Sequence, residues 1–146
     1  MVSGLRSAWS KIYAEVCALT VAITVSACGG GDDDASTAGD PGQGRQIAES
    51  NACPGCHGDN LAGSNTLVPG TSTPNLTPDK ATGLGNWSDK QIKSAILDGI
   101  DNRGKALCAT MARYKQQMTA RQVNDLVAYL RSVPPVSHAL PEDTCE

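Results

Sequence analysis

The chain has 146 residues, with 15 acidic and 12 basic side chains and a formal net charge of −3. This balance excludes the basic excess that nucleic-acid-binding domains use to contact phosphates. Only 3% of the residues are aromatic and none is Phe, so a single small domain has little apolar material of its own from which to build a core.

The first 27 residues have the outline of a signal peptide, with Arg6 and Lys11 ahead of an apolar run from Val16 to Ala27. The run is too short for a permanent transmembrane helix. It ends in Val25-Ser26-Ala27-Cys28, which resembles the signal-peptidase box of bacterial lipoproteins and implies lipid on Cys28. An ordinary secretory signal cleaved nearby is the alternative. In both cases the product is exported, and we expect a membrane-anchored lipoprotein on the periplasmic or cell-surface side.

Residues 28–40 consist of Gly, Asp and small side chains with nothing to bury. This composition predicts a flexible tether, carrying the lipid at its first residue. A single folded domain is then expected over residues 41–146.

Three helix starts in that domain share one capping pattern. Asp40 precedes a proline and Gln43, and Ser88–Gln91 and Thr119–Gln122 are Ser/Thr-x-x-Gln capping boxes. Apolar stripes of helical spacing follow the second and third starts: Ile92, Ala95, Ile96, Gly99 and Ile100, then Val123, Leu126, Val127 and Leu130. Pro134-Pro135 ends the third helix. No segment alternates as a strand would, so the sequence predicts an all-α fold of three to four short helices with long loops.

Between the first two helices lies Cys53-Pro54-Gly55-Cys56-His57, a Cys-x-x-Cys-His pattern typical of c-type haem attachment. Both thiols can add to the haem vinyl groups, and the histidine can ligate the iron. A thioredoxin-like dithiol would need a βαβ pattern, and structural zinc would need four Cys or His ligands in two spaced pairs. The sequence offers neither. We expect one covalently bound haem c, which would also complete the thin core.

Six cysteines are present; two belong to the haem motif and two to the first 28 residues. Cys108 and Cys145 remain. In an oxidising compartment this even remainder predicts a disulfide between them, and two free thiols are the alternative.

The order of these motifs resembles the class I c-type cytochromes, in particular bacterial single-haem cytochromes related to the cytochrome subunits of dehydrogenases. The resemblance covers roughly residues 41–135. Beyond the haem motif it lies in three stretches, at residues 74–79, 82–89 and 126–132 (Pro-Asn-Leu-Thr-Pro-Asp, Thr-Gly-Leu-Gly-Asn-Trp-Ser-Asp and Leu-Val-Ala-Tyr-Leu-Arg-Ser). It implies a cytochrome c fold whose first and last helices cross with Gly44 or Ala48 against Tyr129.

The resemblance also implies a methionine as the second iron ligand, in the loop between the second and third helices. Met111 lies in this loop, whereas Met118 precedes a helix cap and His138 lies in the tail, so both of these are expected to be structural. The family often has proline beside this methionine, but Ala109 and Ala112 occupy those places here.

Three further residues are assigned to the surroundings of the cofactor by the same resemblance. The second ring nitrogen of His57 would donate to the carbonyl of Pro74, rather than of Pro69. Trp87 would bond a haem propionate through its indole N–H, with a plain core tryptophan as the alternative. Asn75, next to Pro74, is the third residue expected to contribute to cofactor binding.

A haem closed on both faces by His57 and Met111 leaves no open iron position, so we expect one-electron transfer and no enzyme activity of the chain itself. A cytochrome subunit of a membrane-bound dehydrogenase or oxidase is an alternative. A haem enzyme or gas sensor with a displaced Met111 is another. The cations that bracket Met111 are Arg103, Lys105, Arg113, Lys115 and Arg121. They predict either a docking surface for an acidic redox partner or simply a solvated loop.

Overall fold

The computed structural model describes residues 38–66 and 71–141. The expected signal peptide, the lipidated Cys28, most of the tether and Cys145 lie outside these residues. The helices are α1 (Pro41–Ser50), α2 (Cys53–His57), the short 3₁₀ helix η1 (Leu84–Asn86), α3 (Asp89–Asp98) and α4 (Ala120–Ser132). Within the described part, extended pairing is limited to two isolated bridges, Ser64–Thr73 and Ile100–Ala106. The predicted all-α class is confirmed.

The three long helices begin where their capping residues predict. The Asp40 carboxylate accepts hydrogen bonds from the N–H groups of Gly42 and Gln43, at 2.7 and 3.3 Å. Both capping boxes are complete: the Ser88 and Thr119 hydroxyls accept from the backbone three residues on, and the glutamine side chains there return to the cap N–H at 2.8 Å. Local sequence therefore fixes these helix starts.

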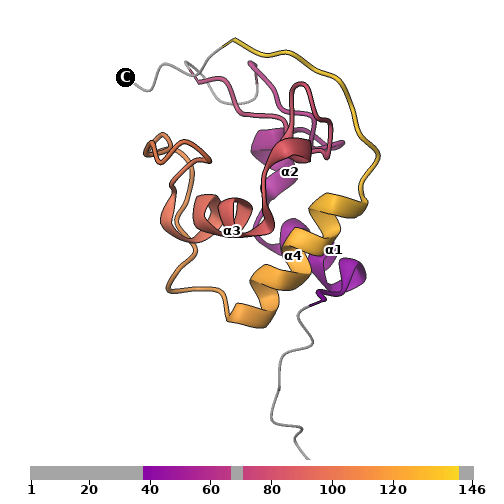
Figure 1. Cartoon of the computed structure of the whole chain (residues 1–146), viewed down its shortest axis with the longest axis vertical. Helices are drawn as coiled ribbons and strands as arrows, with labels where there is room; N and C mark the ends of the chain where they lie inside the picture. Colours follow the sequence, from indigo (N-terminus) through magenta and orange to yellow (C-terminus); the bar gives the residue numbers. More distant parts are fainter. Residues whose placement is uncertain (1–37, 67–70, 142–146) are drawn as a thin grey trace, which may run out of the picture. The chain divides into compact units, whose positions relative to one another are not determined.

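The first and last long helices cross closely, as the resemblance implied (Figure 1). The crossing point is Gly44, where an added Cβ would lie 1.9 Å from the carbonyl oxygen of Asp125 and 2.7 Å from Tyr129 Cβ. The N–H of Asp40 adds a 2.8 Å hydrogen bond to the buried carboxylate of Asp125. Two segments 85 residues apart in sequence are thereby joined at the start of α1.

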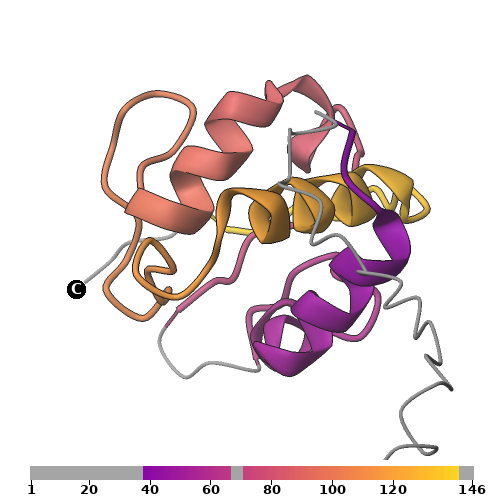
Figure 2. The same ribbon diagram turned by 90° about the horizontal axis from the view of Figure 1, so that it is seen from below.

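The core lies where α4 packs against both α1 and α3; Figure 2 shows α4 running between the other two. It is formed by Ala48, Leu61, Leu84, Ile92, Ile96, Val123, Leu126, Val127 and Leu130. The apolar stripe predicted for α3 included Gly99 and Ile100, which lie beyond the end of the helix. The helix ends at Asp98, Gly99 takes a left-handed conformation with φ of 69°, and Ile100 joins a bridge instead.

Within residues 38–66 and 71–141, no helix combines the length and apolar character needed to cross a membrane.

Candidate haem-binding site

The Cys-x-x-Cys-His motif forms its own short helix, α2, directly after the left-handed residue Ala52. Residues three and four positions apart lie on one side of a helix, so Cys53, Cys56 and His57 are neighbours on a single turn. Cys53 is half-buried and packs against the core, whereas Cys56 is exposed, and both thiols are free. This turn presents two thiols and an imidazole together.

His57 is held in one orientation. Its side chain is buried, with 5% exposed, and its Nδ1 lies 2.9 Å from the carbonyl oxygen of Pro74. A carbonyl can only accept, so Nδ1 carries the hydrogen and Nε2 keeps its lone pair. Burial lowers the pKa of His57 against an opposing contribution from the Pro74 carbonyl. The lowered pKa favours the neutral ring, which is the form that ligates metals.

Loop contacts fix the Pro74 carbonyl relative to α2. The hydroxyl of Thr73 donates to the carbonyl of Cys56 at 2.7 Å, and the N–H of Gly63 donates to the carbonyl of His57 at 2.8 Å. The last carbonyls of this short helix are thus satisfied by the segment that precedes Pro74. Thr73 was not among the residues assigned from the sequence, because nothing local marks a hydroxyl that bonds 17 residues back.

Asn75 lies in the loop directly after Pro74, and its place near the cofactor stays a prediction. It is 2% exposed, and its amide donates to Thr82 Oγ1 at 2.9 Å and to the carbonyl of Val136 at 2.7 Å, while its oxygen accepts from the N–H of Thr77 at 2.9 Å. These bonds tie the loop after Pro74 to the C-terminal tail. Asn75 therefore acts on the site by holding the loop that presents the Pro74 carbonyl.

The loop that carries Met111 is attached to the end of α3. The N–H of Leu107 donates to the carbonyl of Gly99 at 2.8 Å, and the N–H of Tyr114 donates to the carbonyl of Ile96 at 3.1 Å. Burial raises the pKa of Tyr114. Tyr114 packs against the same core cluster as Cys53 of α2, so this loop and the α2 motif share one core.

The other two candidate iron ligands have structural surroundings. Met118 is half-buried against the core just before the cap of α4, and its N–H donates to the carbonyl of Tyr114 at 2.9 Å. His138 Nδ1 lies 3.0 Å from the carbonyl oxygen of Ala62. These positions agree with the structural roles expected for both residues.

A family model described as Cytochrome c matches residues 42–134. The chain belongs to the cytochrome c family. Two thiols on one turn beside a neutral, oriented imidazole are the donor set that a covalent haem requires, so the residues present fit the group. The cytochrome binds one haem c through this motif, and its function is electron transfer.

A curated relative is one of the subunits of nicotinate dehydrogenase from Pseudomonas putida, which is 32% identical over 111 residues. The match takes in 68% of this cytochrome but only 9% of the relative. The chain therefore corresponds to a small part of that longer protein. The similarity agrees with the expected resemblance to cytochromes of dehydrogenases.

Trp87 is half-buried against the core of the cytochrome, and the segment that carries it is held by Arg131, a residue with no role assigned from the sequence. Arg131 on α4 donates to the carbonyl of Leu84 at 2.8 Å, to the carbonyl of Trp87, and to the carboxylate of Asp89 at 2.9 Å. Arg131 and Trp87 are 44 residues apart, so no local signal marks the pair. The bond from Trp87 to a propionate stays a prediction.

Two of the cations around Met111 form ion pairs with acidic side chains, which reduces the positive charge of this surface. Arg103 pairs with Asp101 at 3.3 Å and Lys115 pairs with Asp98 at 2.7 Å. Both acids directly precede the run. Arg113 is half-buried and donates to backbone carbonyls of its own loop, and its part in a docking surface stays a prediction. Lys105 is exposed.

Cys108 is buried, with 8% exposed. Its proposed partner, Cys145, is outside the described residues, so the pairing of the two stays a prediction.

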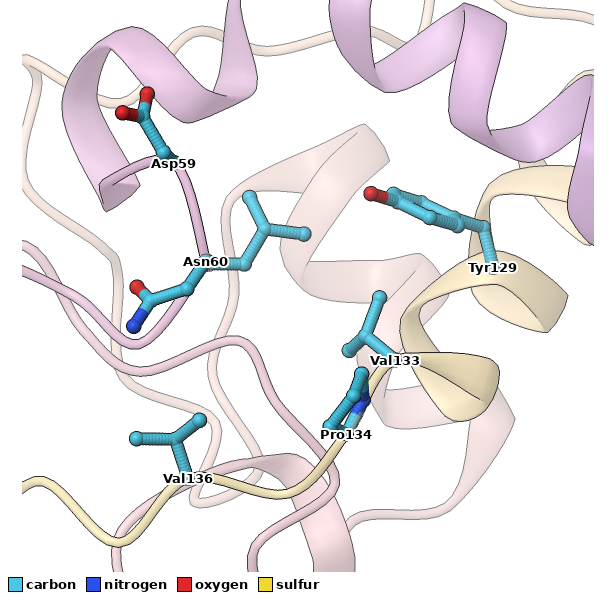
Figure 3. A pocket seen from close by; sticks show the side chains of 7 residues that line it. Asp59, Asn60, Tyr129, Val133, Pro134 and Val136 are labelled. Carbon is cyan, nitrogen blue, oxygen red and sulfur yellow. The ribbon is translucent and has the colours of Figure 1, made fainter.

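A small cavity of about 200 Å³ lies beside Tyr129 of α4 (Figure 3). It is lined by Asp59, Asn60, Leu61, Tyr129, Val133, Pro134 and Val136. None of the expected haem contacts is among these residues.

Proposed function

We propose that the mature chain is a lipid-anchored, single-haem electron carrier whose iron is ligated by His57 and Met111. The observation that carries the proposal is the buried His57 ring, held at 2.9 Å by the Pro74 carbonyl beside two free thiols on the same helical turn. This arrangement gives a fixed ligand that needs no movement when the redox state changes.

When bound, the haem supplies a one-electron couple at its iron. The chain contributes the attachment, through Cys53 and Cys56, and the orientation of His57. The bond from His57 Nδ1 to the Pro74 carbonyl increases the basicity of the ring at Nε2. The thioether of Met111 is a weak, soft donor that favours the ferrous state and so raises the potential.

Met111 is the candidate for the second ligand because of the position of its loop. Tyr114, three residues further on, packs against the same core cluster as Cys53. Met118 packs against the core and His138 bonds Ala62, so both alternatives already have structural contacts. These observations support His/Met ligation.

Paired methionine variants test the ligand. In the oxidised protein, Met111→Leu should abolish the weak near-infrared sulfur-to-iron band and lower the midpoint potential, because a soft donor is lost. Met118→Leu, the matched control, should keep the band. The proposal is wrong if Met118→Leu loses the band and Met111→Leu retains it.

The lipid anchor at Cys28 is inferred from the sequence alone. With lipid on Cys28, the thirteen residues to the folded domain would have an r.m.s. reach of roughly 20 Å and a maximum near 45 Å. A carrier with this reach would exchange electrons between membrane-bound partners without diffusing away. Cys28→Ser should move the protein from the membrane fraction to the soluble fraction, and unchanged membrane association would contradict lipid attachment at Cys28.

A second function is favoured by one finding, the similarity to part of a much longer nicotinate dehydrogenase chain. The protein would then be the cytochrome component of a membrane-bound dehydrogenase complex. Stable co-purification of a larger oxidoreductase chain with the lipidated protein, surviving high salt, would favour this function over a free carrier.

A further inference from the structure

The side chain of Arg113 bonds three backbone carbonyls of the loop that carries Met111. Its guanidinium donates to the carbonyl of Leu107 at 2.8 Å, to that of Cys108 at 3.2 Å, and to that of Met111 itself. Three carbonyls of one loop thus converge on a single half-buried cation.

The space for this cation is provided by Gly99, the left-handed residue that ends α3. An added Cβ there would lie 1.7 Å from Arg113 Nε and 2.2 Å from its Cζ. The guanidinium therefore packs on the bare backbone of Gly99. The same residue accepts the N–H of Leu107 at 2.8 Å, so the cation lies where the loop leaves α3.

The loop needs such a restraint. Ala109 and Ala112 flank Met111 closely and are exposed, and alanine does not restrict the backbone as proline would. In the turn at Met111, the N–H of Met111 donates to the carbonyl of Cys108 at 3.1 Å. A planar guanidinium supplies several donors in a fixed geometry, which an ammonium cannot do.

We propose that Arg113 is a positioning residue that holds Met111 against the iron and keeps that coordination position closed. The proposal rests on the Met111 ligation proposed above. Without the three bonds, the carbonyl of Met111 loses its tie to Leu107 and Cys108, and the thioether leaves the iron more often. A small ligand can then reach the iron, so Arg113 separates an electron carrier from a ligand-binding haem.

The test compares Arg113→Gln and Arg113→Lys with the parent holoprotein. Lys90→Gln, which removes one exposed charge from the first turn of α3, is the matched control. Carbon monoxide binding to the reduced protein, thermal loss of the near-infrared band, thermal unfolding by circular dichroism, and hydrogen exchange of the amides of residues 107–114 are measured for each.

We expect Arg113→Gln to bind carbon monoxide about tenfold faster or more, since charge-assisted bonds are lost. Its near-infrared band should disappear below the temperature of global unfolding, and amides in the loop should exchange faster. Arg113→Lys, which can serve fewer of the three carbonyls, should be intermediate, and Lys90→Gln should match the parent.

Two failures are distinguishable. If the parent shows the band and Arg113→Gln keeps the parental carbon monoxide rate and loop exchange, the positioning role is overturned and Met111 ligation stands. If the parent itself lacks the band, Met111 ligation fails, and unchanged loop exchange in Arg113→Gln would then overturn the restraint as well. Loss of the band only together with global unfolding would reduce Arg113 to a general stabilising role and overturn the proposal.

Discussion

Gly44 shows how a single missing side chain determines the packing of the molecule. Even one methyl group there would overlap the carbonyl of Asp125, at 1.9 Å, and force α1 away from α4. Gly44→Ala should therefore lower the free energy of unfolding by about 1–3 kcal/mol, measured by denaturant titration of the holoprotein. Gly42→Ala, on the same helix, is the matched control, since an added Cβ at Gly42 meets only the side chain of Asp40, at 3.2 Å. An equal loss of unfolding free energy in both variants would contradict the role of Gly44 in the crossing of α1 and α4.

Asp79 gives the fold a dependence on acid. Its carboxylate accepts from the Thr82 hydroxyl at 2.8 Å, from the Thr82 N–H at 2.7 Å and from the Ala81 N–H at 3.1 Å. These bonds lower the pKa of Asp79 below its ordinary value of 3.8, the hydroxyl contributing most. A lowered folded pKa means that the stabilisation is complete above 3.8 and is lost as the pH falls toward the folded pKa.

Asp79→Asn keeps an oxygen acceptor but does not titrate. Urea unfolding of the parent and the variant should therefore differ most above pH 3.8, and the difference should shrink in stronger acid. A stability difference that stays constant through this range would show that the Asp79 charge does not contribute.

At the scale of the elements, the helix starts could be predicted because a cap depends on residues only three apart. The buried stripe of α4 could be predicted for the same reason. The end of α3 could not, because Ile100 continues the apolar spacing although Gly99 has already turned the chain.

The hydrogen bonds that hold the loops of the haem site could not be predicted from the sequence, because they join segments far apart in the chain. Asn75 bonds Val136, 61 residues away, and Arg131 bonds the carbonyl of Trp87, 44 residues away. The bonds of Arg113 to its own loop were not predicted, because the sequence shows Arg113 only as one of the cations that bracket Met111. The space beside Gly99 that admits its guanidinium exists only in the folded chain. The bond from His57 to the Pro74 carbonyl was predicted, from the resemblance and not from the residues alone.

The cap of α4 gives a prediction at this scale. The Thr119 hydroxyl accepts the N–H of Gln122 at 3.2 Å, and α4 carries four of the buried apolar core residues. Thr119→Ala should cost about 1 kcal/mol of stability, seen as a lower denaturant midpoint with an unchanged slope. Thr119→Ser keeps the acceptor and should be close to the parent. A similar loss in both variants would place the effect elsewhere than in the cap.

On the scale of the whole molecule, the helices enclose a small core and leave several large apolar side chains only half-buried around it. These include Leu76, Trp87, Leu97, Tyr114 and Met118. The thin aromatic content of the sequence agrees with this arrangement. A covalent haem would supply the apolar surface that these side chains lack, so the haem would pack as part of the core.

Docking of redox partners also belongs to this scale. Pairing of Arg103 and Lys115 with acids leaves a weaker positive field than the sequence implies. Lys105→Gln combined with Lys115→Gln should slow reduction by an acidic partner at low salt by a few fold, with the difference vanishing at high salt. Arg45→Gln, on α1, should have little effect. An unchanged salt dependence in the double variant would remove these two lysines from the docking surface.

The measurement that tests haem attachment and ligation most directly is the optical spectrum of the mature protein, oxidised and reduced, before and after extraction under denaturing conditions. We predict haem that stays with the chain, a sulfur-to-iron band in the near infrared when oxidised, and no rapid carbon monoxide binding when reduced. Bound haem without that band would contradict ligation by Met111 and favour a ligand-binding haem. Haem that is extracted from the chain would contradict covalent attachment at Cys53 and Cys56.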